Sequence, residues 1–104
     1  MIPTAEPLSL ASLVTPVEGG IGSRVLSKAP GGTITLFVFD AGQGLTEHTS
    51  PYDAMVQVLE GEFVLTIGGV ECRAPEGTVV RLPATVPHAL EAPVRSRMLL
   101  MMVK

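Results

Sequence analysis

The sequence predicts an all-β fold, either a small barrel or a sandwich. Short runs rich in β-branched and aromatic residues recur along the chain, and glycine or proline separates them at short intervals. No long amphipathic helix is visible. With 104 residues the chain is long enough for one domain with one core. We therefore expect an irregular segment over residues 1–20 and a single β-barrel domain over residues 21–104.

The irregular segment contains one ambiguous run, residues 8–14, which fits either a helical turn or an edge strand. The glycine-rich residues 18–22 then interrupt it. Residues 33–39 follow as a strand that is apolar on both faces, which is typical of a strand buried on both sides. We expect Phe37 and Phe39 to lie on an outer sheet face that a second subunit covers.

The rest of the domain reads as further short strands. Gly68 and Gly69 stand between two apolar runs, which is a strong signal for a two-residue hairpin turn. The expected strands after the first are residues 54–59, 63–67, 70–74, 78–82 and 97–103.

Composition limits the possible partners. Hydrophobic residues make up 46% of the chain and charged residues 16%, so a monomer would expose much apolar surface. We therefore expect a homodimer. The net charge of −3 and the absence of lysine or arginine clusters argue against nucleic acid or an anionic membrane as partner.

The N-terminus lacks the basic and apolar pattern of a signal peptide, and no apolar run approaches the roughly 20 residues of a membrane helix. Cys72 is the single cysteine and cannot form an internal disulfide. We expect a cytoplasmic protein in which Cys72 is a buried structural thiol.

The two histidines of the chain lie in two separate stretches, each of which begins with glycine. In the first, Gly42 stands five residues before His48, and Gly61 closes the stretch. In the second, residues 77–92, a glycine is followed by Pro83 and then by His88. Their order, spacing and separation resemble the two motifs of the cupin superfamily. The resemblance implies an antiparallel jelly-roll β-barrel.

The family motifs also imply a metal site of three histidines and one glutamate inside the barrel. In this chain Ser50 occupies the motif position of the second histidine, and Ala54 occupies the position of the glutamate. In the second motif Thr85 replaces a glycine and Ala92 an asparagine. Two of the four implied ligands remain, His48 and His88.

Several side chains could complete a site around these two histidines. Alternation along a strand places Ser50 on the same face as His48. Tyr52 and Gln57 could orient a small polar ligand, although residues 51–53 also fit a solvated turn. The expected interior residues are His48, Ser50, Ala54, Val56, Val58, Thr85 and His88, with Tyr52 and Gln57 beside them.

A metal centre is the alternative use of the same histidines. Catalytic zinc typically has three protein ligands, and non-haem iron adds a carboxylate to two histidines. Asp53 would supply that carboxylate if a bulge beside Pro51 turned it inward. The expected metal set is then His48, His88 and Asp53, holding zinc, iron, nickel, copper or manganese.

Three functions are compatible with these residues and their spacing. The first is a barrel that binds a small molecule without an essential metal, favoured by the missing ligands. The second is a metal-dependent enzyme, an oxygenase or isomerase by resemblance. The third is a structural or interaction barrel whose interior is packed shut.

The methionines are expected to serve packing, and Arg81 is expected to be solvated or at an interface. The sequence names no substrate.

Overall fold

The computed structural model describes residues 1–104 and is all-β, apart from one short 3₁₀ turn, η1 (Leu10–Ser12). The strands are β1 (Ile21–Ala29), β2 (Gly32–Phe39), β3 (Gly44–His48), β4 (Asp53–Glu60), β5 (Glu62–Ile67), β6 (Val70–Pro75), β7 (Val79–Leu82), β8 (His88–Glu91) and β9 (Ser96–Val103). No helix in the structure has the length and apolar character needed to cross a membrane.

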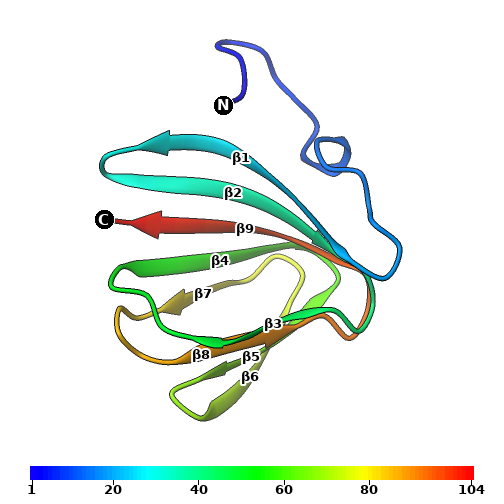
Figure 1. The fold of residues 1–104 in the computed structure, drawn as a ribbon. Helices are drawn as coiled ribbons and strands as arrows, with labels where there is room; N and C mark the ends of the chain where they lie inside the picture. The colour runs from blue at the N-terminus through cyan, green and yellow to red at the C-terminus, as the bar shows by residue number, and fades with distance from the viewer.

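The strands form two antiparallel sheets that face each other. The larger has the order β1-β2-β9-β4-β7, and the smaller has the order β3-β8-β5-β6. The chain changes sheet at every connection except β1–β2 and β5–β6, so the connections β3–β4 and β7–β8 both cross between the sheets. Figure 1 shows the sheets close together at the end where β2 meets the β3 connection, and spread apart at the end that holds the C-terminus. The jelly-roll barrel predicted from the sequence is confirmed.

The expected strands are present, and their bounds differ from the expected ones by no more than one residue at either end. Within residues 8–14 the segment Leu10–Ser12 forms the 3₁₀ turn η1, and no edge strand is present there. Gly68 and Gly69 both have positive φ, at 57° and 81°, and join β5 to β6 in register. Two successive residues with positive φ are what a type I′ hairpin turn requires, which explains why glycine occupies both positions.

The core fills the end of the barrel where the sheets are close, which we call the closed end. Phe39 and Phe63 are fully buried there, with their rings edge to face and their centroids 5.2 Å apart. Met98 on β9 is fully buried beside them. Phe37 is half-buried against the same cluster. The expectation that Phe37 and Phe39 face outward is therefore wrong: alternation points both residues into the barrel.

The outward residues of β2 are Leu36 and Val38, and the N-terminal segment covers them. Val14 packs against both in a second buried cluster. The buried guanidinium of Arg97 donates to the carbonyl oxygens of Leu10 and Val14, each at 3.4 Å. At Leu36 and Val38 the double-sided apolar pattern of β2 thus reflects burial by the chain's own N-terminal segment.

Candidate functional site

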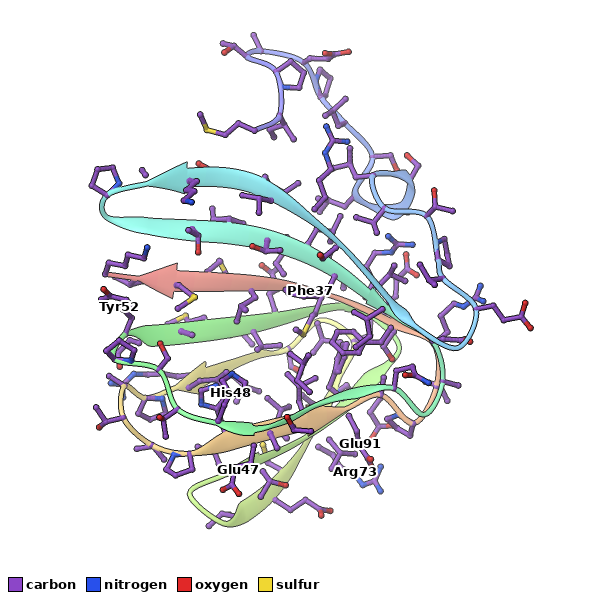
Figure 2. All side chains as sticks on the ribbon, in the orientation of Figure 1. Phe37, Glu47, His48, Tyr52, Arg73 and Glu91 are labelled. Atoms are coloured by element: carbon purple, nitrogen blue, oxygen red, sulfur yellow. The ribbon has the colours of Figure 1, made fainter.

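The two histidines meet on the inner face of the smaller sheet. His48 ends β3 and His88 begins β8, and the two are paired directly across the strands. Their ring centroids are 4.4 Å apart, with an interplanar angle of 68°. His88 is buried, at 7% exposure, whereas His48 is exposed to solvent. Figure 2 shows His48 between the two sheets, at the end where they diverge.

A β-bulge brings His48 to this face. Leu45 pairs with Leu90 and His48 with His88, so β3 spans three positions where β8 spans two. Because side chains alternate along a strand, residues three apart would normally face opposite sides. The extra residue restores His48 to the inner face, where Leu45 packs against the core.

The backbone fixes the same tautomer in both rings. Nδ1 of His48 lies 2.8 Å from the carbonyl oxygen of Thr46, and Nδ1 of His88 lies 3.2 Å from that of Val86. A carbonyl oxygen only accepts hydrogen bonds, so each Nδ1 carries the hydrogen. In the neutral ring Nε2 then presents a free lone pair. The site therefore offers two hydrogen-bond acceptors at the barrel mouth.

The inner face around the histidines is apolar and partly open to solvent, and we call this region the open end. Inward positions of the larger sheet change from fully buried at Phe39 and Met98 to half-buried at Leu100 and Met102. Across from them, Ile67 pairs with His88 and is also half-buried. A ligand at the histidines would thus touch apolar side chains on both sheets.

One surface pocket is present, and it lies elsewhere. It has a volume of about 430 Å³ and is lined by residues of the smaller sheet, among them Gly44, Thr66, Ala89 and Glu91. These residues alternate with the inward Leu65 and Leu90, so the pocket is on the sheet's outer face. Figure 2 shows Glu91 pointing away from the larger sheet. Neither histidine lines this pocket.

The other expected ligand contacts are dispersed. The Ser50 hydroxyl accepts a hydrogen bond from the Tyr52 backbone N–H at 3.2 Å. Tyr52 is at the outer rim, with Nζ of Lys104 5.5 Å from its ring centroid. Gln57 is exposed and alternates with Val56 and Val58, which are buried inward as expected. The structure therefore does not bring Gln57 to the histidines.

Asp53 is held on the outer side of the barrel mouth. Its Oδ1 accepts a hydrogen bond from the backbone N–H of Ala84 at 2.8 Å. Its Oδ2 lies 3.4 Å from the Arg81 guanidinium, so Arg81 is an ion-pair partner. These two interactions, the Ala84 hydrogen bond foremost, lower the pKa of the Asp53 carboxyl below its ordinary value. The bulge that would turn Asp53 inward is not beside Pro51; the bulge lies in β3.

The side chains do not fit the metal centre that the family resemblance implies. Ser50 and Ala54 replace two of its ligands, and Asp53 is engaged with Arg81 and Ala84. No group of three or more histidine, cysteine, aspartate or glutamate side chains is arranged so that it could hold a metal ion. Two imidazoles alone are fewer than the three protein ligands that catalytic zinc typically has.

Sequence reasoning missed the backbone groups that orient the site. The carbonyl oxygens of Thr46 and Val86 and the N–H of Ala84 leave no sequence signal of their own. Thr85 did carry a sequence signal, because it occupies the position where the family motif has glycine. Its φ is +66°, in the left-handed region that favours glycine. The chain keeps the glycine conformation there without the glycine.

Comparisons with known proteins agree with this architecture. A conserved protein of unknown function from Streptococcus pyogenes is 39% identical, with a TM-score of 0.92 over 99% of this chain and 90% of that one. A cupin superfamily protein from Desulfitobacterium hafniense is 29% identical, with a TM-score of 0.90 over 98% and 94% of the two chains.

A cupin 2 conserved barrel domain protein from Leptotrichia buccalis is 37% identical, with a TM-score of 0.88. The match covers 93% of this chain and 47% of that longer one. No curated protein matches the sequence. The cupin domain family matches residues 35–104, which include both histidines and seven complete strands. The chain belongs to the cupin family.

Proposed function

We propose that this cupin binds an uncharged, partly apolar small molecule at the open end of the barrel, where His48 and His88 accept hydrogen bonds from it. The observation that carries the proposal is the shared tautomer of the two rings. Each Nδ1 is occupied by a backbone carbonyl, and each Nε2 is left as an acceptor. In the neutral ring of His88, Nε2 stays available to accept a hydrogen bond from a ligand that donates one.

The surroundings define the class of ligand. The nearby inward positions are apolar, with Ala54, Leu100 and Met102 on the larger sheet. No carboxylate or ammonium group stands among them to balance a charge. Placing an unpaired charge there would carry a large desolvation cost. These features support a ligand with a hydroxyl or N–H donor on an apolar body, such as a phenol or a small aromatic alcohol.

A metal-dependent oxygenase or isomerase receives less support from the same residues. The incomplete ligand set argues against a resident metal, and Asp53, the expected third ligand, is held by Arg81 and Ala84. A barrel that is packed shut is disfavoured by the half-buried inward side chains Leu100 and Met102. The binding barrel is the function that the geometry favours.

We also propose that the protein forms a homodimer and works in the cytoplasm. The outer face of the larger sheet carries a row formed by Ile34, Met101 and Met55, which lie side by side in register on β2, β9 and β4. Ile34 is 37% and Met55 42% exposed, and the N-terminal segment covers only the neighbouring part of this face. A second copy related by a twofold axis would cover this row with its own copy of the row.

The lone Cys72 is consistent with a reducing compartment such as the cytoplasm.

The binding proposal is tested by an NMR-detected screen of small phenols and aromatic alcohols, with phenol as the reference probe. We expect phenol to shift the ring signals of His48 and His88. The His88→Ala variant should weaken binding about tenfold or more, because one hydrogen bond at a buried site is lost. Its thermal stability should stay close to that of the parent protein.

The matched control is Gln57→Ala, which removes a polar side chain from the outer face of β4. This variant should bind phenol as the parent does. The proposal is wrong if no compound of the screen perturbs the histidine rings, or if His88→Ala binds as tightly as the parent.

A further inference from the structure

The two connections that cross between the sheets at the open end are bound to each other. Residues 49–52 carry the chain from β3 to β4, and residues 83–87 carry it from β7 to β8. The backbone N–H of Thr85 donates to the carbonyl oxygen of Ser50 at 2.7 Å. Figure 1 shows both connections on the side of the molecule where the C-terminus lies. His48 lies just before the first connection, at the end of β3, and His88 lies just after the second, at the start of β8.

Asp53 provides the second link between the same connections. It begins β4, and its carboxylate accepts the N–H of Ala84, next to Thr85. Arg81 on the neighbouring strand β7 holds the other side of the carboxylate. The two links, Thr85 to Ser50 and Ala84 to Asp53, form what we call the crossover clamp. Asp53 is the only side chain that accepts a hydrogen bond in it.

The clamp leads directly to both rings. After Thr85 the chain reaches Val86, whose carbonyl oxygen fixes Nδ1 of His88. Before Ser50 the chain passes through His48, whose place opposite His88 depends on the β3 bulge. A bulge interrupts the ladder between β3 and β8 just before His48. The clamp is a second connection between the two segments that carry the rings.

The conformation of Thr85 is evidence of such a restraint. A β-branched residue at a φ of +66° is strained, and this conformation persists only where the surroundings impose it. The surroundings here are the turn closed by the Val86 N–H on the Pro83 carbonyl oxygen at 3.4 Å, the hydrogen bond to Ser50, and the Ala84–Asp53 bond. The strained residue is also exposed, so packing does not explain its conformation.

We propose that Asp53 is a positioning residue: by holding the N–H of Ala84 it fixes the approach of His88 to His48, and so sets the affinity of the open end for its ligand. The part that concerns affinity rests on the proposed function. The part that concerns ring geometry does not, because it can be measured without any ligand. Asp53 thereby acts on the site through the backbone and not as a ligand.

The test compares Asp53→Ala, Asp53→Asn and Arg81→Gln in the full chain. Asparagine keeps an oxygen that can accept the Ala84 N–H, and alanine does not. Arg81→Gln is the matched control, since it removes the ion pair and leaves the Ala84–Asp53 bond. With only two histidines in the chain, the ring protons and nitrogens can be resolved by NMR without ambiguity. The readouts are the ring-to-ring NOE, the tautomer of each ring, and phenol affinity.

We expect Asp53→Ala to lose most of the ring-to-ring NOE and to bind phenol about tenfold more weakly. Asp53→Asn and Arg81→Gln should retain the NOE and bind within about threefold of the parent. Orienting partners of this kind are typically worth 10- to 100-fold at metal sites, which sets the scale. Thermal unfolding of each variant establishes that the fold is retained.

Two results would overturn the assignment of Asp53. One is an Asp53→Ala protein with an unchanged NOE and tautomers; the other is an Asp53→Asn protein as disturbed as Asp53→Ala, which would show that the charge acts and not the acceptor. If the parent binds no phenol but the NOE responds as expected, the proposed ligand class fails and the positioning role of Asp53 stands. The two proposals can thus fail separately.

Discussion

The rings of His48 and His88 lie edge to face with centroids 4.4 Å apart, one exposed and one buried, across an irregular pair of strands. Each ring is anchored at Nδ1 by the carbonyl oxygen two residues before it. This arrangement keeps two acceptor nitrogens available at the mouth of a barrel whose other end is filled by aromatic side chains. The chemistry available at the open end depends on these two nitrogens.

Replacing Thr85 by glycine should stabilise the protein. A left-handed conformation costs an L-residue about 1–2 kcal/mol. Glycine avoids that cost but adds about 0.4–1 kcal/mol of unfolded-state entropy to be lost on folding. The net gain in the free energy of unfolding should lie between zero and about 1.6 kcal/mol, measured by urea denaturation. The reverse change, Gly77→Ala at a φ of +83° in open space, should destabilise by about 1 kcal/mol. A destabilised Thr85→Gly protein would show that Thr85 is not strained.

The closed end should tolerate truncation poorly. Phe39 is fully buried with its ring against Phe63, whereas Phe37 is half-buried. Phe39→Leu should lower the free energy of unfolding by about 1–2 kcal/mol, because apolar contact is lost and a cavity remains. Phe37→Leu should cost less. Equal losses at the two positions would contradict the burial gradient along the barrel.

The outer apolar row should control association. In Met55→Lys a charge enters the row beside Met101, and burying it unpaired would be costly. Size-exclusion chromatography with light scattering should report a dimer for the parent protein and a monomer for Met55→Lys. Val70→Lys is the control, because Val70 is 69% exposed at the β5–β6 hairpin, away from this face. A Met55→Lys protein that remains dimeric would place the interface elsewhere.

Acid should weaken the fold through two aspartates. Hydrogen bonds from the backbone N–H groups of Gly19 and Ala41 lower the pKa of Asp40, and the N–H of Ala84 with Arg81 lowers that of Asp53. The unfolded chain therefore binds protons at a higher pH than the folded one, so stability falls as the pH drops below the ordinary aspartate value of 3.8 and through the lowered folded pKa values. Urea unfolding across this range should show a smaller pH dependence in Asp40→Asn and in Asp53→Asn. An unchanged slope in both would contradict the assignment.

Elemental analysis should find zinc, iron, nickel, copper and manganese well below one atom per chain. The reason is the donor set: two imidazoles, with serine and alanine where the family motif places two further ligands. Protein purified without a histidine tag or added chelator is the correct sample. Near-stoichiometric metal that His88→Ala abolishes would revive the metal-dependent alternative.

The strand content could be predicted because it depends on local pattern. The alternation of β4 predicts Ala54, Val56 and Val58 inward and Gln57 outward, and the structure has them so. The direction of β2 could not be predicted, because both of its faces are apolar. Only the position of the N-terminal segment decides that Val38 is covered from outside while Phe39 enters the core.

By itself the sequence determined the barrel, the hairpin glycines and the presence of His48 and His88 in cupin-like stretches. The tertiary structure decided what those residues can do. The extra residue in β3 turns His48 inward, and Asp53 faces Arg81 and Ala84 instead of the histidines. Bulges and backbone hydrogen bonds between distant connections are cooperative results of packing two sheets together. They depend on where the backbone lies, which no local pattern of side chains records.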